Sequence, residues 1–203
     1  MPWCKIGKCA DAKWRLRMTL EEVRKMIDCV DTQIKPLFLE RMACAEHVAA
    51  AKAENGSDVF VPDRENEIIL KRTGDVDVSV KREYEMFLRH LMSVCRRYQY
   101  GILTEMQEQV IAEALKQAGL DEHVSHEQIT VSFTDHREKS SLNLYLNMIR
   151  LNEIPIDHME LKSQGNEQQV TIQLHGNLKQ SDMRRLVCQL GKEAENFQIL
   201  SLQ

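Results

Sequence analysis

The chain is poor in aromatic residues, has no long hydrophobic run, and carries no excess of positive charge. Only 5% of its 203 residues are aromatic, so we expect an aliphatic and methionine-rich core. No stretch of 18 apolar residues occurs, which argues against a membrane-spanning helix, and we see no signal-peptide pattern at the N-terminus. The formal net charge of -4 argues against nucleic-acid binding. With 43% hydrophobic and 29% charged residues, the composition is that of a globular protein of one or two domains.

The six cysteines are scattered and contain no C-x-x-C pair. This distribution favours reduced thiols, and hence a cytoplasmic protein, over a disulfide framework. Cys4 and Cys9 leave open a metal site or a disulfide, and His123 with His126 forms an H-x-x-H pair, which we interpret as part of a loop. We expect neither a metal nor a cofactor.

A long helix is the strongest structural prediction. Thr19 and Glu22 form a potential capping box, and Asn55-Gly56 is a typical helix end. Between them, apolar positions recur at spacings of three and four, which predicts about 36 helical residues, or roughly 54 Å. A stripe of that length calls for a partner helix, most simply from a second subunit. Pro36 predicts a bend within the helix.

The remaining pattern predicts a fold of class α plus α+β. We expect helices at 63–72, 79–100 and 104–116, and then strand, helix, strand, strand, helix and strand at 128–133, 140–151, 156–162, 169–175, 181–194 and 197–202. This βαββαβ order is typical of the ferredoxin-like split motif. The predicted organisation is a tail (1–18), a helical domain (19–103), a linker helix (104–124) and a small α/β domain (125–203). The tail is either a solvated arm or a contact for a membrane surface or a partner.

Four cations and one acid mark a potential ligand site: Arg24, Arg41, Lys52, Arg64 and Glu65. Charges in or beside an apolar stripe are costly unless they are paired, and one glutamate cannot neutralise several cations. The set therefore indicates a small anionic ligand with carboxylates or phosphates. The alternative is a group of ordinary surface ion pairs, which is weakest for Arg41 because it occupies the stripe itself.

Helix geometry separates these cations into two groups. Arg41 and Lys52 fall within about 20° of the same face, roughly 16 Å apart, so one ligand could lie between them. Arg24 is about 25 Å from Arg41 and roughly 100° around the helix, so on a straight helix it cannot touch the same small ligand. It either serves another purpose or reaches the equivalent site of a partner chain. The long stripe and the distant arginine both indicate a homodimer with shared sites. On the third predicted helix, Cys95 and Gln99 share a face.

These residues resemble the all-helical chorismate mutase family over about residues 19–99. The resemblance rests on the segments LEEVRKMIDCVDTQI, LERMACAEHVAAAK, VPDRENEIIL and CRRYQ, in that order. It implies an intertwined homodimer with a three-helix domain that converts chorismate to prephenate in phenylalanine and tyrosine biosynthesis. It also implies that the reaction needs no cofactor.

The resemblance also assigns roles to individual residues. Arg24 of one subunit would bind a substrate carboxylate in the other subunit's site, and Arg41 would bind a carboxylate in its own subunit. Lys52 and Gln99 would donate to the ether oxygen. The remaining positions would complete the pocket, with Glu65 at the substrate hydroxyl, Arg64 near the carboxylate end and Cys95 on the wall. Val61 departs from the family because some members carry an acidic residue there, and Cys95 departs because it replaces a hydroxyl.

The C-terminal half resembles an ACT-type regulatory domain in its element order and size. The resemblance implies regulation by phenylalanine or tyrosine, but TDHREKSS lacks the small turn that is common at such sites. A dimerising role is the alternative for this half. For the whole chain, the alternative to an enzyme is a non-catalytic amino-acid sensor or scaffold subunit.

Overall fold

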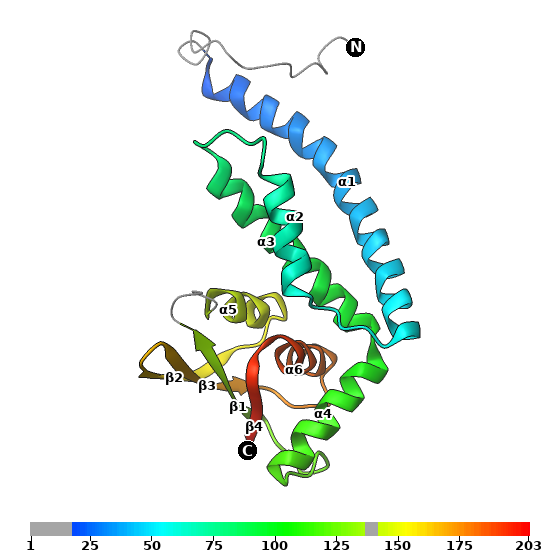
Figure 1. Ribbon diagram of the computed structural model, residues 1–203, viewed down its shortest axis with the longest axis vertical. Helices are drawn as coiled ribbons and strands as arrows, with labels where there is room; N and C mark the ends of the chain where they lie inside the picture. Colours follow the sequence, from blue (N-terminus) through cyan, green and yellow to red (C-terminus); the bar gives the residue numbers. More distant parts are fainter. Residues whose placement is uncertain (1–17, 137–141) are drawn as a thin grey trace. The chain divides into compact units, whose positions relative to one another are not determined.

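The computed structural model describes residues 18–136 and 142–203, shown as a ribbon in Figure 1. The tail with Cys4 and Cys9 lies outside the described residues, as does part of the TDHREKSS loop. The described chain forms two compact units, of which the first ends at Ala43 and the second is Cys44–Gln203. Each unit is described by itself.

The predicted long helix is present as α1 (Leu20–Asn55). Its capping box is confirmed, because the Thr19 amide donates to Glu22 Oε2 at 2.7 Å and the Glu22 amide donates to Thr19 Oγ1 at 3.3 Å. Gly56 follows with a φ of 69°, the left-handed conformation that commonly ends helices. Pro36 lies inside α1 without ending it.

Three helices follow in the second unit. They are α2 (Pro62–Arg72), α3 (Lys81–Ile102) and α4 (Thr104–Ala118), each within two residues of its predicted bounds. The left-handed Gly119, with a φ of 67°, ends α4. Among the residues that the structure describes, no helix has the length and apolar character that crossing a membrane requires.

The C-terminal part is a four-stranded antiparallel sheet with helices, in the predicted βαββαβ order. Its elements are β1 (Gln128–His136), α5 (Leu142–Leu151), β2 (Ile156–Gln164), β3 (Glu167–His175), α6 (Ser181–Glu193) and β4 (Glu195–Leu202). The strand order is β2-β3-β1-β4, with Val131 opposite Ile172 in the central pair. The strands are two or three residues longer than predicted because their polar ends continue the hydrogen-bonded ladder.

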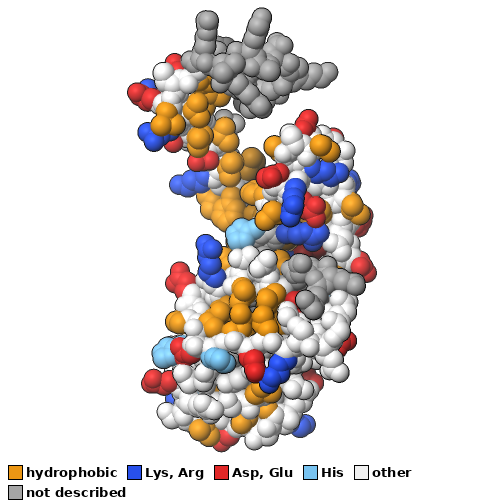
Figure 2. All heavy atoms as spheres, turned by 90° about the vertical axis from the view of Figure 1, so that its left-hand side faces the viewer, with side chains coloured by type: hydrophobic (Ala, Val, Ile, Leu, Met, Phe, Trp, Pro, Cys, Tyr) orange, Lys and Arg blue, Asp and Glu red, His pale blue; other side chains and the backbone are white. Residues whose placement is uncertain are grey.

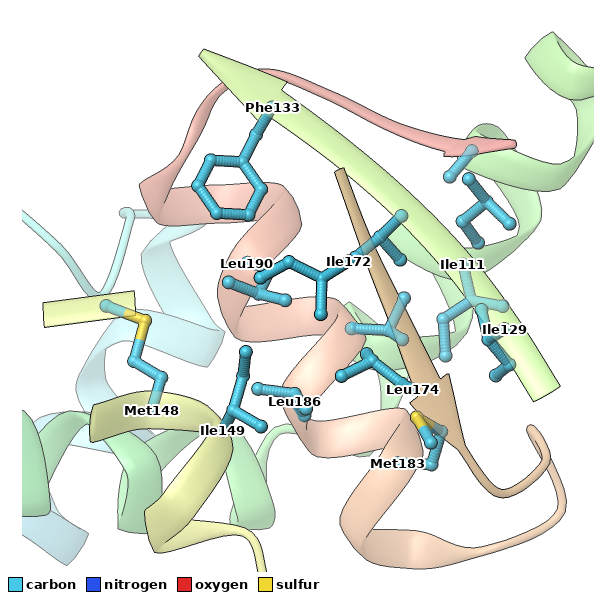
Figure 3. Packing of buried hydrophobic residues seen from close by; sticks show 14 of the residues in the cluster. Ile111, Ile129, Phe133, Met148, Ile149, Ile172, Leu174, Met183, Leu186 and Leu190 are labelled. Atoms are coloured by element: carbon cyan, nitrogen blue, oxygen red, sulfur yellow. The ribbon is translucent and has the colours of Figure 1, made fainter. Parts of the chain in front are cut away.

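One aliphatic core fills the space between the sheet and α5 and α6 (Figure 3). Inward residues of β1 and β3 meet Met183, Leu186 and Leu190 of α6, all fully buried. Helix α4 adds Ile111 and Leu115 to the same core, so it packs on the sheet part of the molecule. Fully burying each such side chain contributes about 1.5–3 kcal/mol, which makes this core the main source of stability in the unit.

Gly191 allows α4 and α6 to approach closely. A Cβ at this position would lie 2.6 Å from Val110 Cγ1 and 3.4 Å from the Phe197 ring. We expect Gly191→Ala to lower the free energy of unfolding by roughly 1–2 kcal/mol, because overpacking outweighs the gain in helix propensity. Denaturant unfolding checks this expectation. Gly74→Ala is the matched control, because its nearest neighbours would be at 3.6 Å or more; equal stability of the two variants would contradict the packing role.

Many apolar side chains of α1 are exposed in the single chain. Hydrophobic side chains form a visible strip on the face shown in Figure 2. The strip consists of Leu20, Val23, Met26, Ile27, Val30, Ile34, Leu37, Phe38 and Leu39, each at least a third exposed. An apolar surface of this extent usually marks an interaction site.

Candidate active site

Lys52 lies in the last turn of α1 and points to the loop that follows. Its Nζ donates to the carbonyl oxygens of Asp58 at 2.6 Å and Val59 at 2.8 Å. Partial burial lowers the pKa of Lys52, the carboxylates of Asp58 and Glu65 raise it, and Arg96 lowers it further. Lys52, Glu65 and Arg96 therefore belong to one electrostatic cluster.

A buried ion-pair chain connects three helices of the second unit. Arg96 of α3 donates from Nε to Glu193 Oε1 of α6 at 2.9 Å, and from Nη1 to Glu65 Oε1 of α2. Its guanidinium also lies over the Phe60 ring, 4.7 Å from the centroid. The side chains of Glu193 and Glu65 are 1% and 21% exposed, so the chain runs from the interior to a partly open carboxylate.

The charge state of this chain follows from burial and pairing. Burial raises the pKa of Glu193, while Arg96 and the donor Gln189 Nε2, 3.1 Å from Glu193 Oε1, oppose that rise. Burial works to lower the pKa of Arg96, but the two carboxylates outweigh it and the pKa is raised. Arg96 therefore stays cationic at any working pH.

The C-terminal half of α3, which carries Arg96, also carries the other two predicted residues of this helix. Cys95 is buried, and Gln99 is 8% exposed. Gln99 Oε1 has no hydrogen-bond partner among the described residues, although an amide oxygen normally finds a donor when buried. Next to them Tyr100 joins an apolar cluster with Ala49, Val59, Leu103 and Cys188, which closes the end of α1 against α3 and α6.

The other predicted residues lie elsewhere. Arg24 and Arg41 are on α1 in the first unit, with Arg24 exposed and Arg41 partly buried. Arg64 is exposed on α2 and pairs with Glu67 at 2.6 Å, so within the second unit it is not part of the Lys52 cluster. Val61 precedes the first turn of α2 and is exposed.

Two residues of the cluster, Arg96 and Glu193, are not among those predicted from sequence. Arg96 falls in the apolar stripe of α3, four residues after Met92, and the reasoning that singled out Arg41 could have found it. Glu193 carries no comparable local signal, because only the packing of α6 on α3 brings it to Arg96.

Three further features were candidates for a site: a surface hollow, His126 and groups of metal-binding side chains. A surface hollow lies at the turn between α2 and α3, beside Lys71 and Tyr84, and none of the predicted site residues lines it. His126 bonds to the Val124 carbonyl at 2.7 Å and accepts from the Leu178 amide at 3.1 Å, in keeping with a structural role. Within residues 18–136 and 142–203, no three metal-binding side chains gather at one point.

Cys188 gives a direct test of the closed cluster around Tyr100. It is fully buried, and burial raises the pKa of its thiol to about 12. At pH 8 roughly one thiol in 10⁴ would be ionised, so we expect a thiol reagent to leave Cys188 unmodified in the folded protein. Peptide mapping after native labelling checks this, with denatured protein as the control; rapid native modification would show that the cluster opens.

Comparison with known proteins bears on the helical part. Residues 23–100 match the family model "Chorismate mutase type II". The match spans less than half of the chain and leaves the sheet part uncovered. Searches of curated proteins and of solved structures gave no match.

Proposed function

We propose that the protein is a chorismate mutase that acts as a homodimer. The observation that carries the proposal is the family match over residues 23–100, a span that contains every predicted site residue from Arg24 to Gln99. The common electrostatic cluster of Lys52 and Glu65 supports it. We also infer a cytoplasmic location from the scattered cysteines, of which the four in the described residues form no disulfide.

The proposed reaction is an intramolecular rearrangement. The ether C–O bond of chorismate breaks while a new C–C bond forms, and no proton or electron is exchanged with the protein. Negative charge grows on the ether oxygen as its bond breaks, so fixed donors at that oxygen stabilise the transition state. Arginines on the two carboxylates hold the flexible side chain over the ring, which removes rotational freedom before reaction.

Lys52 and Gln99 are suited to the donor role. An ammonium group has three donors, and two of those on Lys52 already bond to loop carbonyls. These bonds fix the side chain, and we assign the third donor to the ether oxygen. Gln99 is a neutral amide in a buried position, and it would add a second donor.

Glu65 and the arginines complete the proposed site. Glu65 keeps a partly exposed carboxylate that would accept from the substrate hydroxyl, and Cys95 would line the wall. Arg41 and Arg64 would bind or support the carboxylates of the same subunit's substrate. Arg24 would come from the partner subunit, whose α1 would cover the exposed apolar strip.

For the sheet part we propose an ACT-like regulatory role, with phenylalanine or tyrosine as effector. Its support is the antiparallel βαββαβ arrangement. A purely dimerising role is the alternative. For the whole chain, a non-catalytic scaffold or sensor is favoured by one observation: Lys52 and Glu65 already have partners within the chain.

The first experiment mixes the purified protein with chorismate and follows its absorbance, with and without phenylalanine or tyrosine. Rapid loss of chorismate with formation of prephenate is the expected result, and an amino-acid effect on the rate would support regulation. Chorismate that persists at the uncatalysed rate would favour the scaffold.

A further inference from the structure

We propose that Glu193 and Arg96 are positioning residues for Glu65, so that the sheet part of the molecule supplies a side chain the active site needs. This inference rests on the proposed mutase function. It adds to the active site a residue, Glu193, that lies outside the segment matched by the family model. It would make α6 a part of the site.

The geometry places the three side chains in series. Arg96 is only 5% exposed, and its Nε and Nη1 donate in two directions, to Glu193 and to Glu65. The Phe60 ring covers the guanidinium. A planar donor fork held in this way can fix the orientation of the Glu65 carboxylate, whose other acceptor sites stay available to a substrate hydroxyl.

The two donor directions of Arg96 give Glu193 a specific role. A buried guanidinium with one carboxylate partner would bind that partner as a bidentate pair and neutralise it. Glu193 accepts from Nε instead, so the guanidinium directs only Nη1 to Glu65. The more exposed Glu65 therefore keeps acceptor capacity for the ligand, while the 1% exposed Glu193 holds the other side of the guanidinium from the interior.

The surroundings hold Glu193 in place. Gln189, one turn earlier on α6, donates to the same Oε1. Cys188 of α6 packs in one apolar cluster with Tyr100 and Ala49, so α6 is joined to α3 and to the end of α1. Lys192 of α6 forms an ion pair with Asp58 at 2.6 Å. Asp58 lies in the loop whose carbonyl oxygens accept hydrogen bonds from Lys52, so α6 is also linked to that loop.

A double-mutant cycle on kcat/KM tests the inference. The four proteins are the wild type, Glu193→Gln, Glu65→Gln and the double variant, all as full chains. We expect Glu193→Gln to lower kcat/KM by about 10-fold to 100-fold, as for a misplaced contact group. We expect little further loss when Glu65 is already glutamine, because Glu193 acts through Glu65.

Asp182→Asn is the matched control, since it removes a half-exposed carboxylate near the start of α6 that pairs with Arg185 and not with Arg96. It should leave kcat/KM unchanged. Should Glu193→Gln not fold, Glu193→Asp takes its place in the cycle, with a smaller loss expected because the carboxylate is retained.

The outcomes separate the two proposals. The same fold-loss from Glu193→Gln with and without Glu65 would show a merely structural role and overturn this inference, as would an unchanged rate. A wild-type protein that turns over no chorismate would overturn the proposed function, and this inference with it.

Discussion

Replacing Lys52 with alanine is expected to lower kcat for chorismate by about 10²–10³-fold, equivalent to ~3–4 kcal/mol of transition-state stabilisation. The ammonium group is held by the Asp58 and Val59 carbonyls. Little free energy is therefore needed to reorient it when charge develops on the ether oxygen. A preorganised donor of this kind acts mainly in the transition state, so kcat should fall more than KM rises. Steady-state kinetics on chorismate provide the measurement.

Two further variants make this result specific. Lys71→Ala removes an exposed lysine from α2 and should leave kcat unchanged. Lys52→Gln keeps a donor without the charge and should retain more activity than Lys52→Ala. Normal turnover by Lys52→Ala, with circular dichroism showing a folded protein, would remove Lys52 from the proposed mechanism.

Arg24→Ala is expected to cause a loss comparable to that of Lys52→Ala, although Arg24 is exposed in the single chain. The reason is its proposed place in the partner's site, where it would bind a substrate carboxylate through its planar donor fork. Because that contact exists in the ground state as well, we expect KM to rise together with the fall in kcat.

Subunit mixing distinguishes a shared site from a site within one chain. Inactive Arg24→Ala and Lys52→Ala proteins are unfolded together and refolded. In a shared-site dimer, each mixed dimer has one intact site, so random pairing should restore about a quarter of wild-type activity. Either variant refolded alone is the control, and a mixture that stays inactive would place Arg24 and Lys52 in the same subunit's site.

Much of the fold was predictable because its causes are local. The bounds of α1 follow from a capping pair three residues apart and from a glycine that adopts a left-handed conformation. The strands follow from alternation, since every second residue of β3 faces the core. The predicted ends were off by up to three residues because polar residues extend the ladders of β1 and β3.

The site was predictable only in part. The sequence singles out Lys52 and Glu65, and the structure places them in one cluster, where the Glu65 carboxylate opposes the lowering of the Lys52 pKa by burial. Arg64 was also singled out, yet it points to solvent and pairs with Glu67, because a helix-surface arginine finds a carboxylate three residues away at little cost. The sequence pattern does not distinguish these two situations.

By itself, the sequence of this protein determined the helices, the strand order along the chain, and the set of cations in the helical part, because each depends on spacings of a few residues. Only the tertiary structure decided that Glu193 meets Arg96 across 97 positions of the chain, and that Gly191 lies against Val110. Contacts of that kind depend on how whole elements pack, and the packing is fixed by the shared burial of the apolar core rather than by any local pattern.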